Sequence, residues 1–334
     1  MAERWVLAGG SGLVGRALAQ ELAAEGATVV ILSRRAAPSG DAGETEGSLS
    51  GSVGRGAGGP EAQGGAAGTI RVVHWDPADS RRPWAAEMAG ATAVVNLAGE
   101  SLGRWPWTPA RRQRLRDSRL VATRGLVAAM EDLPPDLRPS VLLSASGADY
   151  YEGLDEEPAT EATPPAATFL ARLCRDWEAE ARQAEELGVR VVILRLGIVI
   201  APAAPAVLRL ALPVRLFLGG PIGSGRQWVS WIDRRDVVGL ARWAAARADI
   251  AGPLNAVAPD PRPQLEVTRI LARLLGRPVW FPTPAWAVRL ALGGQAVLVL
   301  GSRRVWPARA LAAGYVFRRP RLEEALSDAL AGRP

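Results

Sequence analysis

The sequence predicts an α/β fold in which a doubly wound parallel sheet carries a smaller C-terminal lobe. A short apolar run at 5–8 is followed by a glycine-rich turn and a helical pattern, and apolar strand patterns then alternate with helical patterns up to about residue 200. Strands that alternate with helices form parallel sheets covered on both faces. Beyond residue 200 the pattern is less regular, which predicts the lobe.

The strands of the sheet are predicted where short apolar runs occur, at 5–8, 28–32, 70–75, 93–97, 141–144 and 191–196. Helical periodicity predicts helices from the glycine turn to residue 24, at 109–130 and at 169–187. Gly26 ends the first helix. Residues 36–69 are rich in Gly, Ala, Ser and Glu, so they are expected to form a flexible surface insertion.

The domain prediction is therefore a Rossmann domain over 1–200, which includes the insertion, and a substrate lobe with a helical end over 201–334, interleaved with the first domain. Helices are expected near 203–217, 234–247, 264–275, 284–299 and 307–313, and short strands near 228–232 and 254–258. The apolar stretch 286–300 fits a membrane-surface helix or a buried one. We expect a buried helix because the stretch contains one arginine and two glycines.

The turn at 9–15 predicts the site of a dinucleotide. Gly9, Gly12 and Gly15 recur every three residues between a strand and a helix. Glycine tightens such a turn, lets the backbone approach a pyrophosphate and lets the helix pack on the sheet, while the helix amides bind the phosphates. The predicted binding segment is completed by Gly10, Ser11, Leu13 and Val14.

The end of the second strand predicts which dinucleotide is bound. NAD-specific sites usually place an acid there to hold the ribose hydroxyls, whereas this chain reads Ser33-Arg34-Arg35. Hydroxyl and guanidinium groups bind a 2′-phosphate that a carboxylate would repel. We therefore expect NADP(H) in preference to NAD(H). The alternative is that both arginines form a solvated strand end.

Composition excludes several kinds of chemistry. All 40 basic residues are arginine, so a lysine Schiff base, a Walker A loop and a Tyr–Lys pair are absent. One histidine and one cysteine, Cys174, exclude a His/Cys zinc cluster, and no metal site is expected. The arginines are interspersed with acids, no uncharged apolar run reaches about 18 residues, and no signal peptide is recognised at the N-terminus. We expect a cytoplasmic protein that binds neither nucleic acid nor membrane, with a homodimer as an open alternative. A nucleic-acid binder stays an alternative only if the arginines cluster on one face.

With these residues placed, the chain resembles the extended short-chain dehydrogenase/reductase superfamily. More closely it resembles an atypical subfamily, NAD-dependent epimerase-like with a C-terminal domain of unknown function. The matching segments are spread over almost the whole chain outside 36–69: 9–15, 94–100, 118–123, 144–151, 169–178, 195–197, 219–225, 231–236, 252–255, 281–284 and 301–307.

The resemblance implies roles for individual residues. Asn96, Ala98 and Gly99 match the superfamily's Asn-Ala-Gly element, which lines the adenine-ribose side of the cofactor. Asp76 matches an acid that accepts a hydrogen bond from adenine, and Ser146 matches the active-site serine after the fifth strand. The alternatives are a strand-end cap for Asn96, a turn residue for Asp76 and an ordinary loop residue for Ser146. Three neighbours complete the predicted cofactor site: Leu97, Glu100 and Arg119.

The superfamily's catalytic Tyr and Lys positions fall on Leu170 and Cys174 of this chain. A phenol without the lysine is a poor base at neutral pH, and arginine does not transfer protons there. Tyr150 and Tyr151 follow Ser146 closely, so either phenol is a candidate to polarise a substrate carbonyl. Ordinary packing is the alternative for both, and Asp149 is another polar candidate.

The substrate pocket is expected at the carboxyl ends of the strands, roofed by 200–230. Its predicted wall is Phe217, Gly220, Ser224, Gln227, Trp228 and Trp231. The leading interpretation is an NADP(H)-dependent oxidoreductase or epimerase-like enzyme for a small carbonyl or sugar-type substrate. The alternative is a catalytically silent, cofactor-binding regulatory protein, because the resemblance extends to distant relatives linked to bacterial cell division or plastid division.

Overall fold

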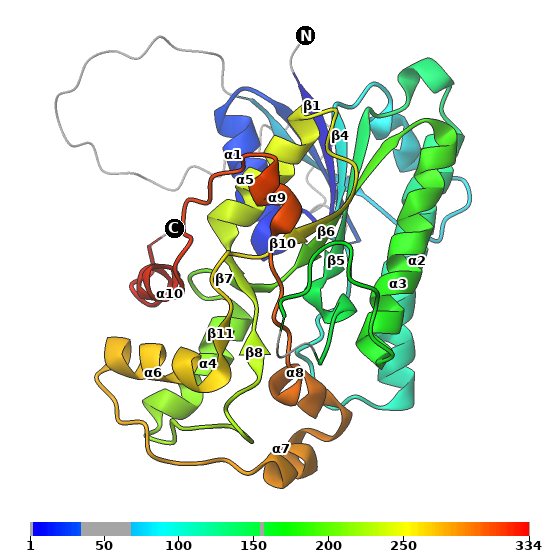
Figure 1. Ribbon diagram of the computed structural model, residues 1–334. Coiled ribbons are helices and arrows are strands. Elements are labelled where there is room, and N and C mark those ends of the chain that lie inside the picture. Colours follow the sequence, from blue (N-terminus) through cyan, green and yellow to red (C-terminus); the bar gives the residue numbers. More distant parts are fainter. Residues whose placement is uncertain (1–2, 35–67, 154–156, 334) are drawn as a thin grey trace, which may run out of the picture.

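The computed structural model describes residues 3–34, 68–153 and 157–333. Its centre is a parallel sheet of seven strands in the order β10-β6-β5-β4-β1-β2-β3 (Figure 1). The predicted Rossmann-like α/β fold is confirmed. The strands are β1 (Arg4–Ala8), β2 (Thr28–Ser33), β3 (Ile70–His74), β4 (Ala93–Asn96), β5 (Val141–Gly147), β6 (Arg190–Leu196) and β10 (Gly252–Ala256).

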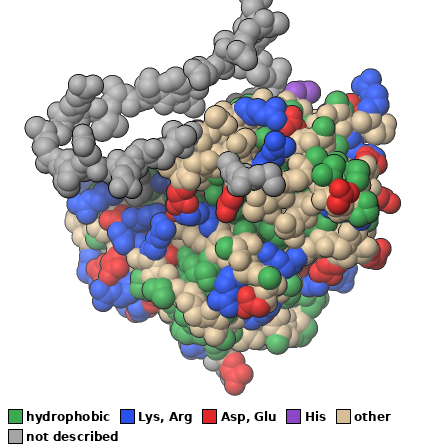
Figure 2. Space-filling model, turned by 90° about the horizontal axis from the view of Figure 1, so that it is seen from above, with side chains coloured by type: hydrophobic (Ala, Val, Ile, Leu, Met, Phe, Trp, Pro, Cys, Tyr) green, Lys and Arg blue, Asp and Glu red, His purple; other side chains and the backbone are tan. Residues whose placement is uncertain are grey.

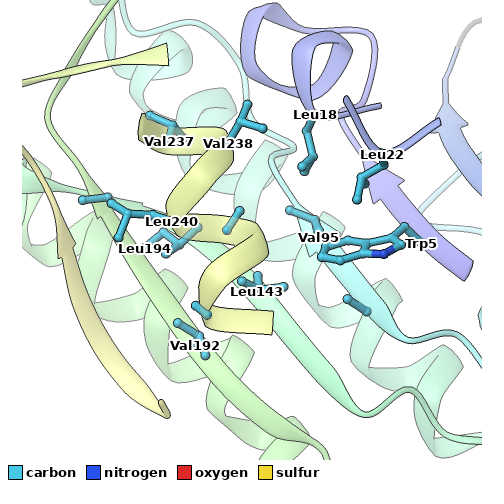
Figure 3. Packing of buried hydrophobic residues seen from close by; sticks show 14 of the residues in the cluster. Trp5, Leu18, Leu22, Val95, Leu143, Val192, Leu194, Val237, Val238 and Leu240 are labelled. Atoms are coloured by element: carbon cyan, nitrogen blue, oxygen red, sulfur yellow. The ribbon is translucent and has the colours of Figure 1, made fainter. Parts of the chain in front are cut away.

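Helices cover both faces of the sheet. On one face lie α1 (Leu13–Ala24) and α5 (Arg234–Ala246), and on the other lie α2 (Pro109–Glu131) and α3 (Phe169–Arg182). Neighbouring residues of one strand point to opposite faces, so Val95 packs in the first layer and Val94 in the second. Figure 3 shows Leu18 and Leu22 of α1 and Leu240 of α5 packed over this first face.

The C-terminal lobe lies below the sheet in Figure 1. Its helices are α4 (Pro205–Arg215), α6 (Gln264–Leu275), α7 (Ala285–Leu292) and α8 (Val297–Leu300), joined by two-stranded pairs of β8 (Trp228–Val229) with β11 (Arg262–Pro263) and β7 (Ile198–Ile200) with β9 (Trp231–Asp233). The chain returns to the sheet through β10 and α9 (Ala308–Ala312), and α10 (Leu322–Leu330) packs with α6 and β7.

Strand β10, which lies beyond residue 200, joins the main sheet, in keeping with the predicted interleaving of the two parts. The structure departs from the sequence prediction in three places. Helix α10 is not among the predicted helices. β5 continues to Gly147, so Ser146 lies within the strand and not after it. The predicted buried helix at 286–300 is wrong for its first half, because Trp286 and Leu290 are 68% and 81% exposed. The predicted insertion lies, apart from Gly68 and Thr69, outside the described residues.

Candidate functional site

A cleft of about 680 Å³ opens where the carboxyl ends of β1, β2 and β4 meet. Ligands of open parallel sheets bind at this edge. The glycine turn, the ends of the strands and α2 all contribute to the wall, which is formed by Gly9, Ser11, Gly12, Leu32, Ser33, Arg34, Trp75, Pro77, Leu97, Ala98, Gly99, Glu100, Ser101, Arg104, Arg114, Asp117, Ser118, Val121 and Ala122.

Glycine is required at two positions of the turn. Gly9 has φ of +79°, and a Cβ there would lie 2.8 Å from the carbonyl carbon of Leu97. A Cβ on Gly15 would lie 2.5 Å from the Cα of Gly10. Helix α1 therefore packs directly on the turn. Its N-cap is Gly12, which offers no side-chain acceptor to the first amides of the helix, and such amides bind phosphate.

The side chains that follow β2 differ from those of an NAD site. Ser33 is half-buried and Arg34 is exposed, and both line the cleft. Arg35 lies outside the described residues. The acids of the cleft wall are Glu100 and Asp117, which come from the β4 exit and from α2. The end of β2 therefore presents a hydroxyl and a guanidinium to the cleft, without a carboxylate.

The β4 exit places backbone at the cleft. Leu97, Ala98 and Gly99 line it, whereas Asn96 is fully buried beneath them. The Asn96 amide nitrogen donates to Thr123 Oγ1 at 2.8 Å, and its Oδ1 accepts from the Ala98 amide at 3.2 Å. Asn96 thus shapes the exit as a cap, which is the alternative that the sequence left open.

Of the residues that follow β3, some line the cleft and one stabilises the turn behind it. The Asp76 carboxylate accepts from the amide of Ala78 at 2.9 Å, as a turn residue does, while its neighbours Trp75 and Pro77 line the cleft. Sequence reasoning missed Trp75, which looks like any apolar strand residue. Its indole Nε1 is buried and finds no acceptor in the described part of the chain.

Arg119 is a buried cation behind the β4 exit. Its side chain is 9% exposed, donates to the Leu115 carbonyl at 2.9 Å and lies 5.2 Å from the centre of the Trp177 ring. Burial lowers the pKa of this guanidinium. Its carbon Cζ would be 3.1 Å from a Cβ on Gly99. Glu100, by contrast, pairs with Arg111.

Ser146 belongs to a buried hydrogen-bonded chain. Its hydroxyl donates to Glu178 at 2.7 Å, and Glu178 accepts two further bonds from Arg195 at 2.8 and 2.9 Å. Arg195 also donates to the phenol oxygen of Tyr151, and that hydroxyl donates to Asn255 Oδ1 at 2.9 Å. This hydrogen-bonded network connects three strands of the main sheet, β5, β6 and β10, to helix α3.

The two candidate phenols occupy different environments. Tyr151 is 1% exposed, and burial raises its pKa to about 12 although Arg195 opposes the shift. Tyr150 is half-buried, and the Arg195 guanidinium lies 3.5 Å from the centre of its ring. Tyr151 is therefore held as a structural hydroxyl, and Tyr150 is the phenol that keeps exposed surface.

The superfamily's catalytic positions are packed as core. Leu170 is 2% exposed and belongs to a cluster with Trp107 and Leu115. Cys174 is 5% exposed, and burial raises the pKa of its thiol to about 12. Both residues face the interior from α3. Leu170 has no ionisable group, and the Cys174 thiol stays protonated at neutral pH.

Three of the six predicted substrate residues support the lobe instead. Trp231 is 1% exposed and donates to the Asp260 carbonyl at 2.6 Å, so it packs in the core of the lobe. Gln227 is buried and donates to the carbonyls of Ile222 and Val299. A Cβ on Gly220 would lie 2.0 Å from the carbonyl oxygen of Phe281. The other three, Phe217, Ser224 and Trp228, keep exposed surface.

Across residues 3–34, 68–153 and 157–333, no group of three or more His, Cys, Asp or Glu side chains is arranged to hold a metal ion. Within the same residues, no helix is long and apolar enough to cross a membrane.

Comparison with known proteins identifies the family. Residues 5–256 match the model of the NAD dependent epimerase/dehydratase family, and residues 283–329 match a domain of unknown function, DUF1731. A chloroplastic SDR39U1 homolog of Arabidopsis thaliana is 35% identical over 73% of this chain and 70% of its own length, and an epimerase family protein of Mycobacterium bovis is 33% identical over 97% and 96%. The crystal structure of the human epimerase family protein SDR39U1 with NADPH matches with a TM-score of 0.79 at 29% identity, over 98% of this chain and 99% of that one. The chain therefore belongs to the NAD-dependent epimerase/dehydratase family and carries that family's fold with a DUF1731 C-terminal segment.

Proposed function

We propose that the protein binds NADP(H) in the cleft at the carboxyl ends of β1, β2 and β4, in preference to NAD(H). The observation that carries the proposal is the end of β2, where Ser33 and Arg34 line the cleft without a carboxylate. A 2′-phosphate at this place would gain charge-assisted hydrogen bonds. The similarity to the human protein solved with NADPH supports the same assignment.

Calorimetry with NADPH and NADH tests the cofactor preference. The wild type is expected to bind NADPH at least about tenfold more tightly, because one charge-assisted hydrogen bond contributes about 1.5–3 kcal/mol. Arg34→Ala should remove most of that difference and leave NADH affinity unchanged. Arg81→Ala is the matched control, because Arg81 is an exposed arginine that does not line the cleft. Equal affinities of the wild type for both cofactors contradict the proposal.

We further propose that the protein is an oxidoreductase or epimerase-like enzyme for a small carbonyl or sugar-type substrate. A bound nicotinamide would supply or accept the hydride. Tyr150 is the phenol we assign to the substrate, because Tyr151 already shares its hydroxyl with Arg195 and Asn255. The Ser146 hydroxyl donates to Glu178, and we assign the acceptor capacity that its oxygen retains to a substrate hydroxyl.

A screen of carbonyl compounds and sugar nucleotides, followed by NADPH absorbance, tests the reaction. Once turnover is found, Tyr150→Phe and Ser146→Ala should each lower kcat by about 10²-fold with NADPH affinity unchanged. Tyr151→Phe should lower the melting temperature and affect kcat less. Full activity of both Tyr150→Phe and Ser146→Ala removes these side chains from the chemistry.

A specific observation favours a second candidate function, a cofactor-binding regulatory protein without turnover. The hydroxyls of Ser146 and Tyr151 are bound in the buried network, and the superfamily's Tyr and Lys positions are Leu170 and Cys174 in the core. Tight NADPH binding with no turnover across the screen would support this candidate over the enzyme.

A further inference from the structure

The C-terminal lobe concentrates large apolar side chains in contact with solvent. Of the fifteen exposed large apolar side chains in the described part of the chain, five lie in 208–218 and four in 280–290. Single exposed apolar residues are normal, whereas a concentration marks an interaction surface. We name six of these residues the apolar pole: Leu216, Phe217, Trp280, Phe281, Trp286 and Leu290, which are between 42% and 81% exposed.

The apolar pole is one surface built from neighbouring segments. The amides of Trp280 and Phe281 both donate to the carbonyl of Gly219, at 2.9 and 3.1 Å. The Arg277 guanidinium lies 4.4 Å from the centre of the Phe217 ring. In Figure 1 the loops on either side of these contacts and α7 run together along the lower edge of the lobe, at the end away from the sheet.

The charge of this surface has one sign. The two stretches that carry the pole, residues 213–226 and 277–290, contain two arginines each and no acid. Arg215, Arg277 and Arg289 are exposed beside the pole residues, and no carboxylate of the described residues pairs with them. The opposite end of the molecule differs, because Figure 2 shows arginines and acids interspersed there.

We propose that the apolar pole docks on an anionic lipid surface. Exposed tryptophan, leucine and arginine side chains together are typical of interfacial segments, since the apolar groups enter the headgroup boundary while the cations bind anionic lipid. A second copy of the chain fits less well, because a two-fold contact through this face would set arginines against arginines. The sequence alone favoured a buried helix here, and the exposure of α7 reverses that expectation.

Flotation of the full-length protein with vesicles tests the proposal independently of cofactor binding and catalysis. The protein should float with vesicles that contain phosphatidylglycerol, should bind pure phosphatidylcholine vesicles at least about tenfold more weakly, and should be released by high salt. The double variant Trp286→Ser/Leu290→Ser should bind at least about tenfold more weakly, because two apolar side chains are lost from the contact. Arg289→Gln should weaken binding about fivefold.

Matched controls separate the pole from general surface effects. Val316→Ser removes an apolar side chain that is 83% exposed outside the pole, and Arg81→Gln removes an exposed arginine that pairs with Asp79. Both controls should float like the wild type, and all variants should keep the wild-type melting temperature. Three results overturn the proposal: no flotation with anionic vesicles, unchanged flotation of the double variant, or a wild-type dimer without lipid that the double variant dissociates.

Discussion

The buried pair of Arg195 and Glu178 is expected to be the costliest single interaction in the site to break. Their side chains are 3% and 6% exposed and share two hydrogen bonds of 2.8 and 2.9 Å. Arg195→Met leaves the carboxylate buried without its cation, which costs about 3–5 kcal/mol. At about 2–3 °C per kcal/mol for a chain of this size, the melting temperature should fall by about 6–15 °C.

Urea unfolding of four proteins measures this cost. Replacing both partners with methionine removes the uncompensated charge. It leaves the Ser146 hydroxyl without its acceptor and the Tyr151 oxygen without the donor from Arg195, so the double variant should lose about 2 kcal/mol, less than Arg195→Met alone. Asp176→Asn is the control, because its pair with Arg116 is 31% and 42% exposed and contributes less than about 1 kcal/mol. A loss below about 1 kcal/mol in Arg195→Met, or a larger loss in the double variant, refutes the reasoning.

Three further predictions concern Cys174 and the glycine turn. Burial raises the pKa of the Cys174 thiol to about 12. A disulfide reagent at pH 8 should therefore label Cys174 rapidly in the unfolded chain and more than about 10²-fold more slowly in the folded chain. Fast labelling of the folded protein would contradict the burial of this thiol. Because the folded thiol holds its proton more tightly than the unfolded one, its contribution to stability is present below about pH 8.5 and should fall as pH rises further. Gly15→Ala should abolish NADPH binding, because the added Cβ would lie 2.5 Å from the Cα of Gly10. Gly90→Ala is the control and should retain binding despite some backbone strain, because nothing lies within 4 Å of its added Cβ. Calorimetry compares the two variants, and normal binding by Gly15→Ala would exclude close packing as the reason for glycine at this position.

The site was predictable wherever the signal was local. Short stretches of sequence predict the glycine turn, the strands on either side of it and the Ser33-Arg34 end of β2. The structure brings these features together in one cleft. Trp75 was missed because a strand-end tryptophan has no pattern that distinguishes a cleft wall from core. Gln227 and Trp231, which the sequence predicts as wall residues, donate to carbonyls of neighbouring loops, because polar and aromatic side chains also hold loops together.

The sequence by itself determined the parallel sheet, its glycine turn and the absence of a Tyr–Lys pair. Apolar periodicity and glycine conformation are properties of a few neighbouring residues, and the absence of lysine follows from the composition of the chain. Only the tertiary structure decided which hydroxyls already hold a hydrogen-bond partner inside the protein. Ser146 meets Glu178 32 positions along the chain, and Tyr151 meets Asn255 104 positions along. Likewise, the apolar pattern of α7 is the same for a buried and an exposed helix. Its exposure depends on what else the chain packs against it, and that is settled only when distant segments come together.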